Sequence, residues 1–111
     1  MSTISTHVLD TAVGKPAAGI RVTLEKESGT GPIGSGVTDD DGRLRNLLSP
    51  DTRLEEGTYR LRFEVAAYFA RGGRAAFYPE VVVAFRVGSG NAHYHIPLLL
   101  SPFGYSTYRG S

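Results

Sequence analysis

Alternation of apolar and polar residues is the feature that most constrains the fold of this chain. Within residues 59–65, every second side chain is apolar, from Tyr59 through Leu61 to Phe63. Residues 20–25 alternate in the same way, and residues 81–87 are rich in valine. A period of two places the apolar side chains on one face of a strand. We therefore expect half-buried antiparallel strands.

Turn signals separate these segments. They are rich in glycine, proline, serine and aspartate and fall at residues 14–16, 28–32, 39–42, 49–57 and 88–91. The only good helix window covers residues 65–71. About seven or eight short strands with one short helix predict an all-β sandwich. We expect a single domain over residues 1–111.

The composition excludes several classes of protein. Twelve basic and 11 acidic residues give a net charge of +1, with no basic cluster of the kind that nucleic acids require. The chain has no cysteine, so it contains no disulfide and no thiol chemistry. It shows no signal peptide and no apolar run long enough to cross a membrane. The sequence therefore predicts a cytoplasmic protein.

Three histidines are the strongest candidates for chemistry. His93 and His95 are two residues apart, so on a strand they share one face, and His7 lies in the first expected strand. Three imidazoles can hold a zinc ion with one open position. They can also act without metal, one as a general base while arginine or tyrosine stabilises negative charge. The spacing leaves both alternatives open.

A hairpin is expected at the end of the chain, with residues 93–100 and 105–108 pairing across a loop at 101–104. In this register Leu100 faces Tyr105 and His95 faces Gly110, while Tyr108 is a diagonal neighbour of His95 on the same face. Pro97 has no N–H group, so the ladder must have a gap or an edge there. Arg109 should point away from His95.

Residues 39–42, Asp-Asp-Asp-Gly, superficially resemble a calcium loop. The alternating oxygen ligands, the glutamate at the twelfth position and the flanking helices of an EF-hand are missing. We interpret the segment as a tight turn in which Gly42 takes a positive φ. Arg43 follows directly, and its guanidinium is suited to gripping a planar, oxygen-rich ligand.

Several motifs together resemble one family, the 5-hydroxyisourate hydrolases or transthyretin-like proteins. The matching segments are residues 6–10 (Thr-His-Val-Leu-Asp), 14–17, 38–43, 68–69, 77–80, 93–105 and the terminal Tyr-Arg-Gly-Ser of 108–111. The resemblance implies two four-stranded antiparallel sheets with one short helix near residues 65–72. It also implies a homotetramer, a dimer of dimers, with active sites in the channel between the dimers.

The activity implied by this resemblance belongs to urate degradation. The six-membered ring of 5-hydroxyisourate is opened to 2-oxo-4-hydroxy-4-carboxy-5-ureidoimidazoline, with no metal or organic cofactor. The catalytic positions of the family fall on His7, Arg43 and His95, and the tail contributes Tyr108 and Ser111 to substrate binding. We expect one imidazole of His7 and His95 to activate water and the other to position it or shuttle the proton, with Arg43 holding the substrate and stabilising the oxyanion. His93 has no implied role.

Two alternatives remain at the level of sequence. A non-catalytic carrier of small ligands, like transthyretin, has the same fold but no evident use for the set of His7, Arg43, His95 and the terminal tetrapeptide. A zinc hydrolase is the third reading, and it predicts stoichiometric zinc.

Overall fold

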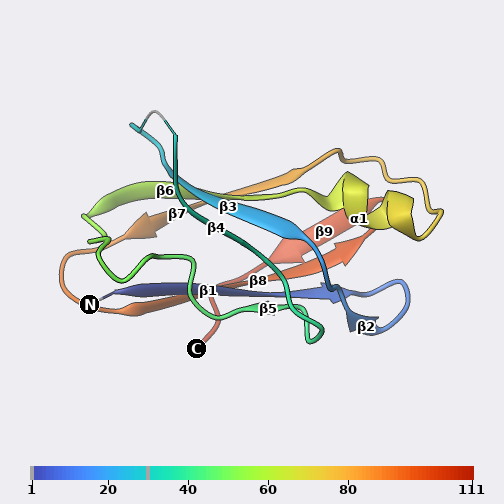
Figure 1. Ribbon diagram of the computed structural model, residues 1–111, viewed down its shortest axis with the longest axis horizontal. Helices are drawn as coiled ribbons and strands as arrows, with labels where there is room; N and C mark the ends of the chain where they lie inside the picture. The colour runs from blue at the N-terminus through green and yellow to red at the C-terminus, as the bar shows by residue number, and fades with distance from the viewer. Residues whose placement is uncertain (1, 30) are drawn as a thin grey trace.

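Two β-sheets stacked face to face make up the body of the protein (Figure 1). The computed structural model describes residues 2–29 and 31–111. Met1, at the start of the predicted domain, and Thr30, within the predicted turn at residues 28–32, lie outside the described residues. The predicted all-β sandwich is confirmed.

The first sheet contains both ends of the chain. Its strands run in the order β2-β1-β8-β9, and β5 also pairs with β1. Their bounds are β1 (Thr3–Asp10), β2 (Lys15–Pro16), β5 (Arg43–Leu44), β8 (His93–Ser101) and β9 (Gly104–Thr107). In Figure 1 both marked chain ends lie in the half of the molecule away from α1.

This sheet differs in two details from the expected pair of four-stranded antiparallel sheets. It has five strands, because β2 and β5 are two-residue segments that both attach to β1. The central pair, β1 with β8, is parallel. No hairpin joins these two strands, since the second sheet lies between them along the chain, so their relative direction is not imposed by a tight turn.

The second sheet is antiparallel throughout, in the order β4-β3-β6-β7. Its strands are β3 (Arg21–Lys26), β4 (Pro32–Val37), β6 (Gly57–Phe63) and β7 (Val81–Val87). The alternation of β6 holds in space: Leu61 and Phe63 are buried, whereas Arg62 points outward between Glu25 and Glu80. Burial of one face of each sheet supplies the main favourable free energy of this fold.

The short helix α1 (Val65–Arg71) follows β6 where the sequence predicted it. It buries Val65 and Phe69 against the end of the sandwich. Within residues 2–29 and 31–111, no helix is long and apolar enough to span a membrane. The core between the sheets is formed by side chains from both layers, among them Ile4, Val8, Val22, Leu24, Tyr59, Leu61, Phe63, Ile96, Leu98 and Leu100.

The predicted hairpin of β8 and β9 is confirmed in its register, with Leu100 opposite Tyr105. The predicted gap is also present, because β9 ends at Thr107 before it reaches the position opposite Pro97. Pairing resumes once, at a bridge between His95 and Gly110, where the Gly110 N–H donates to the His95 carbonyl at 2.8 Å. The tail is therefore fastened to β8 on both sides of the gap.

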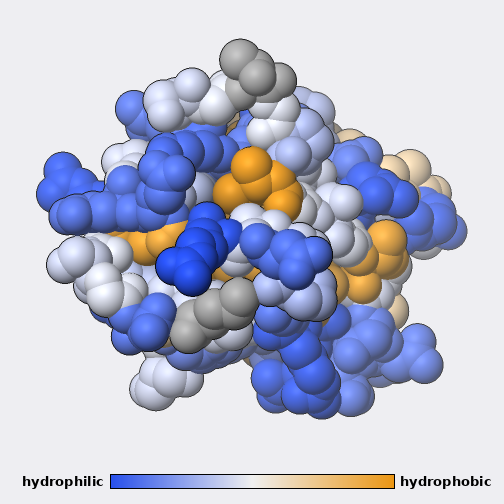
Figure 2. Space-filling view, turned by 60° about the vertical axis from the view of Figure 1, so that its left-hand side comes forward, coloured by the Kyte–Doolittle hydropathy of each residue, from blue (hydrophilic) through white to orange (hydrophobic). Residues whose placement is uncertain are grey.

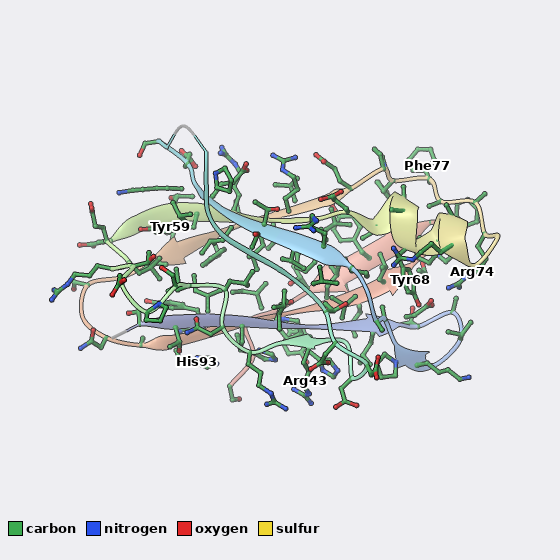
Figure 3. All side chains as sticks on the ribbon, in the orientation of Figure 1. Arg43, Tyr59, Tyr68, Arg74, Phe77 and His93 are labelled. Carbon is green, nitrogen blue, oxygen red and sulfur yellow. The ribbon has the colours of Figure 1, made fainter. Side chains whose placement is uncertain are left out.

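A buried carboxylate fastens the end of β1 to the segment after α1. Asp10 is fully buried (0% exposed) and accepts hydrogen bonds from the Tyr68 hydroxyl at 2.8 Å, the Ala12 N–H at 3.1 Å and the Arg74 guanidinium. Figure 3 shows Tyr68 of α1 and Arg74, in the segment after it, close together. Burial alone would raise the pKa of Asp10, but the bonds from Arg74 and Tyr68 outweigh it, so the pKa lies below its ordinary value.

We expect Arg74→Ala to lower the free energy of unfolding by about 1–3 kcal/mol at neutral pH, because it leaves a buried carboxylate short of a charged partner. The folded-state pKa of Asp10 is depressed, so this contribution is complete above the unfolded pKa and is lost as the pH falls through the folded value. Urea unfolding at about pH 7 and about pH 3 should show the difference shrinking in acid. Arg74→Lys is the matched control that keeps the charge; equal stability of wild type and Arg74→Ala would contradict the expectation.

Candidate active site

His93 and His95 lie on the outer face of the first sheet, as their spacing in β8 predicted. Their rings are stacked, with centroids 6.4 Å apart and an interplanar angle of 13°. Tyr94, between the two histidines, and Ile96, after His95, are buried in the core. The strand thus presents both imidazoles on the face that points away from the second sheet.

A cavity of about 310 Å³ opens on this face. It is lined by residues of β1, β5, β8 and the tail: Ser5, Thr6, Arg43, Leu44, Arg45, His93, His95 and Ser111. In Figure 3, Arg43 and His93 both lie on the outer side of this sheet. Two guanidinium groups beside two imidazoles suit a planar ligand that is rich in oxygen.

His7 lies on β1 directly opposite Arg43 in the pairing of β1 with β5. Its Nε2 donates to the Asp41 carbonyl at 2.9 Å, which leaves Nδ1 unprotonated in the neutral ring. His7 is therefore next to Arg43 at the border of the cavity and is not one of its lining residues.

The tight turn predicted before Arg43 is present, and the Asp39 side chain holds it. The Asp39 carboxylate accepts from the backbone N–H groups of Asp41 and Arg43, each at 2.9 Å. Gly42 has a φ of 75°, and a Cβ atom there would lie 2.4 Å from the Val8 carbonyl oxygen. Within residues 2–29 and 31–111, no group of three or more His, Asp or Glu side chains is arranged to hold a metal ion. The aspartate turn instead sets the position of Arg43 beside His7.

The tail reaches the cavity through its last two residues. Ser111 lines it, and Gly110 lies so close to His95 that a Cβ atom would be 2.5 Å from the His95 Cδ2 atom. Arg109 packs over the Tyr94 ring, with its guanidinium carbon 4.9 Å from the centroid, and so points away from His95 as expected. Only glycine leaves room for the imidazole at this point.

Tyr108 takes a position that the predicted pairing did not anticipate. It is 57% exposed and lines a second, mainly apolar cavity of about 290 Å³ together with residues of β7 and with Tyr94. The reason is the gap at Pro97: without a paired partner, the backbone leaves the ladder after Thr107. In the single chain, Tyr108 therefore does not share the cavity of His95.

Ser5, Thr6 and Arg45 are cavity residues that the sequence did not identify. Ser5 stands out because its hydroxyl is hydrogen-bonded to both imidazoles, at 3.0 Å from His93 Nε2 and 2.8 Å from His95 Nδ1. Its position two residues before His7 placed it on the face of that histidine. The parallel register that brings Ser5 opposite His95 had no signal in the sequence.

The pKa of His95 lies below its ordinary value of 6.5. Burial is the largest cause, followed by electrostatic repulsion from His93, Arg43 and His7, while a hydrogen bond to the backbone of Ser5 acts in the opposite direction. His95 is therefore neutral at pH 7 and has a ring nitrogen able to accept a proton.

Comparisons with known proteins agree with one another. The model of the HIUase/Transthyretin family matches residues 4–110. A 5-hydroxyisourate hydrolase of Salmonella dublin is 46% identical over 110 residues, which cover 97% of this chain and 80% of that protein. The solved 5-hydroxyisourate hydrolase of Klebsiella pneumoniae has a TM-score of 0.87 and 39% identity, covering 99% of this chain and 100% of its own. Transthyretin from Sparus aurata has a TM-score of 0.89 and 31% identity, with 99% and 97% covered.

We expect NMR titration of the imidazole protons to show His95 with a pKa below 6.5. Arg43→Met removes a positive charge near the ring while keeping an apolar side chain, so the pKa of His95 should rise towards its ordinary value. Arg21→Met, an exposed arginine of the second sheet, is the matched control and should leave the pKa unchanged. A His95 that titrates at or above 6.5 in the wild type would contradict this account of the site.

Proposed function

The chain belongs to the HIUase/Transthyretin family, and on that basis we propose that it hydrolyses 5-hydroxyisourate. The product is 2-oxo-4-hydroxy-4-carboxy-5-ureidoimidazoline, which places the reaction in urate degradation. The observation that carries this proposal is the cavity in which His95, Arg43 and Ser111 converge, with His7 at its border. The relatives named 5-hydroxyisourate hydrolase support the substrate.

The proposed reaction uses His95 as the base. Its neutral imidazole takes a proton from water while the oxygen of that water adds to a ring carbonyl of the substrate. The charge that develops on the carbonyl oxygen is stabilised by Arg43. The C–N bond of the ring then breaks, and the proton held by His95 passes to the departing nitrogen. His7, which faces Arg43 across the strand pair, positions the water, and no metal takes part.

We also propose that the protein works as a homotetramer, a dimer of dimers. Each sheet ends in a strand with no further partner in the described chain, β7 in one sheet and β9 in the other, and such edges are natural sites of assembly. Exposed aromatic residues lie in β9 and directly before and after it, among them Phe103, Tyr105 and Tyr108. Figure 2 shows another face of the chain, largely hydrophilic with separate apolar patches.

Tyr108 and Ser111 remain the proposed contacts of the tail with substrate. Ser111 lines the cavity already, whereas Tyr108 needs the assembled protein, or a shift of the tail, to reach a ligand bound beside His95. The single-domain organisation and the cytoplasmic location remain predictions from the sequence.

The decisive experiment generates 5-hydroxyisourate in place from urate and urate oxidase and follows the decay of its ultraviolet absorbance. Wild-type protein should accelerate the decay. His95→Asn should lower kcat about 10²–10⁴-fold because the base is lost, and Arg43→Met about 10²–10³-fold because an oxyanion donor is lost. Removal of residues 108–111 should also abolish most activity, and Arg21→Met is the control.

The same assay separates the alternatives. A non-catalytic carrier predicts wild-type decay no faster than the spontaneous rate, and that outcome would refute the proposed function. A zinc hydrolase predicts loss of activity after exhaustive chelation, whereas we expect full activity.

For the proposed assembly, analytical ultracentrifugation of the wild type should give a mass of four chains of 11.9 kDa. Val82→Glu places a charge at an exposed position of the β7 edge strand and should shift the population towards smaller species. A wild type that sediments as a monomer at micromolar concentration would contradict the tetramer.

A further inference from the structure

We propose that Ser5 and His93 act as positioning residues that hold His95 in the tautomer protonated on Nδ1, with the lone pair on Nε2. This inference deepens the proposed function, because it assigns the groups that keep the base ready in the same site. Neither Ser5 nor His93 needs to touch the substrate for this role.

The contacts form a continuous chain across the parallel pair of β1 and β8. Ser5 lies opposite His95 and Thr3 lies opposite His93 in the register of these strands. The Ser5 hydroxyl is 2.8 Å from His95 Nδ1 and 3.0 Å from His93 Nε2, and the Thr3 hydroxyl is hydrogen-bonded to His93 Nδ1. Ser5 is only 7% exposed, so water has little access to compete for these bonds.

A single proton on the Ser5 hydroxyl makes this chain directional. The hydroxyl has one proton and two lone pairs, so it can donate to one imidazole and accept from the other, or accept from both. In one arrangement, His95 Nδ1–H donates to Ser5, Ser5 donates to His93 Nε2, and His93 Nδ1–H donates to Thr3. In the reverse arrangement, every donor becomes an acceptor. When Ser5 accepts from both rings, His95 is again protonated on Nδ1, so only the reverse arrangement places its proton on Nε2. The tautomers of His93 and His95 are thus linked whenever Ser5 donates to one of them.

The charges around the cavity favour the first arrangement. With Nδ1 occupied by Ser5, Nε2 is the nitrogen left to meet a ligand, and the cavity that His95 lines also contains Arg43 and Arg45. A lone pair on Nε2 is attracted by these guanidinium groups, whereas an N–H there would be repelled. The other groups near His95 are His93 and His7, which add further positive charge when protonated, and the tail residue Ser111. The first arrangement is also the one that leaves His95 able to take a proton from water.

Four substitutions, in two matched pairs, test this chain of hydrogen bonds. Ser5→Ala removes the hydroxyl, and Ser5→Thr keeps it. His93→Leu removes the acceptor for Ser5, and His93→Gln keeps an amide oxygen that can accept the same hydrogen bond. Ser35→Ala is the control, because it removes one hydroxyl from an exposed position on β4 in the other sheet.

The first measurement is the tautomer of His95, read from its ring nitrogen shifts by long-range ¹⁵N NMR on the protein without substrate. We expect protonation on Nδ1 in wild type, Ser5→Thr, His93→Gln and Ser35→Ala. In His93→Leu the Ser5 hydroxyl is free to donate to Nδ1 as well as to accept from it, so a fraction of His95 should be protonated on Nε2. Ser5→Ala should give a mixture. A wild-type His95 protonated on Nε2, or no change in both Ser5→Ala and His93→Leu, would overturn the proposal.

The second measurement is the hydrolysis of 5-hydroxyisourate. Ser5→Ala and His93→Leu should lower kcat about 10–100-fold, the usual cost of removing a group that orients a functional histidine, with KM changed less than kcat. Ser5→Thr and His93→Gln should recover most of the loss, and this recovery separates positioning from a general effect on folding. Full activity of Ser5→Ala and His93→Leu would overturn the role in catalysis. If the wild type itself lacks activity, the proposed function fails. The ring nitrogen shifts of His95 still decide whether the chain of hydrogen bonds through Ser5 sets its tautomer.

Discussion

The parallel ladder between β1 and β8 is the interaction on which the rest of the structure depends. It runs without interruption from Thr3 opposite His93 to Asp10 opposite Leu100. Its inner face contributes Ile4, Val8 and Leu98 to the core, and its outer face carries the histidines. Both faces share one register, so a slip of a single residue would exchange core and site side chains together. Stability and chemistry are thus set by the same hydrogen bonds.

Beside this ladder, a polar turn and the tail of the chain position the side chains of the site. The Asp39 carboxylate orders the turn that delivers Arg43, and the glycine at position 110 lets the tail approach the His95 ring. The resulting cavity gathers positive charge around an imidazole whose pKa is already lowered by burial. Each of these features involves only a few residues, which is the scale on which a scaffold shared with transthyretin can differ in function.

Much of the fold was predictable from local pattern. Alternation identified β3 and β6, and the loop length together with Pro97 predicted both the β8–β9 register and its gap. The parallel pairing of β1 with β8 was not predictable, because no turn connects them. The bridging role of Ser5 was missed for the same reason, and the position of Tyr108 was wrong because the backbone leaves the ladder at the gap. Which of these residues bind substrate stays a prediction, which rests on the family resemblance.

The distance along the chain between the partners of this ladder has a consequence for how the molecule forms. Thr3 and His93 are ninety residues apart, so β1 leaves the ribosome long before the strand that covers its edge. Contacts between residues so far apart in the sequence form slowly. Until they form, the unpaired strand can associate with other chains. Thr3 and Ser5, on one face of β1, keep that face polar before the strand is paired. The residues that later organise the histidines can therefore also protect the nascent chain from aggregation.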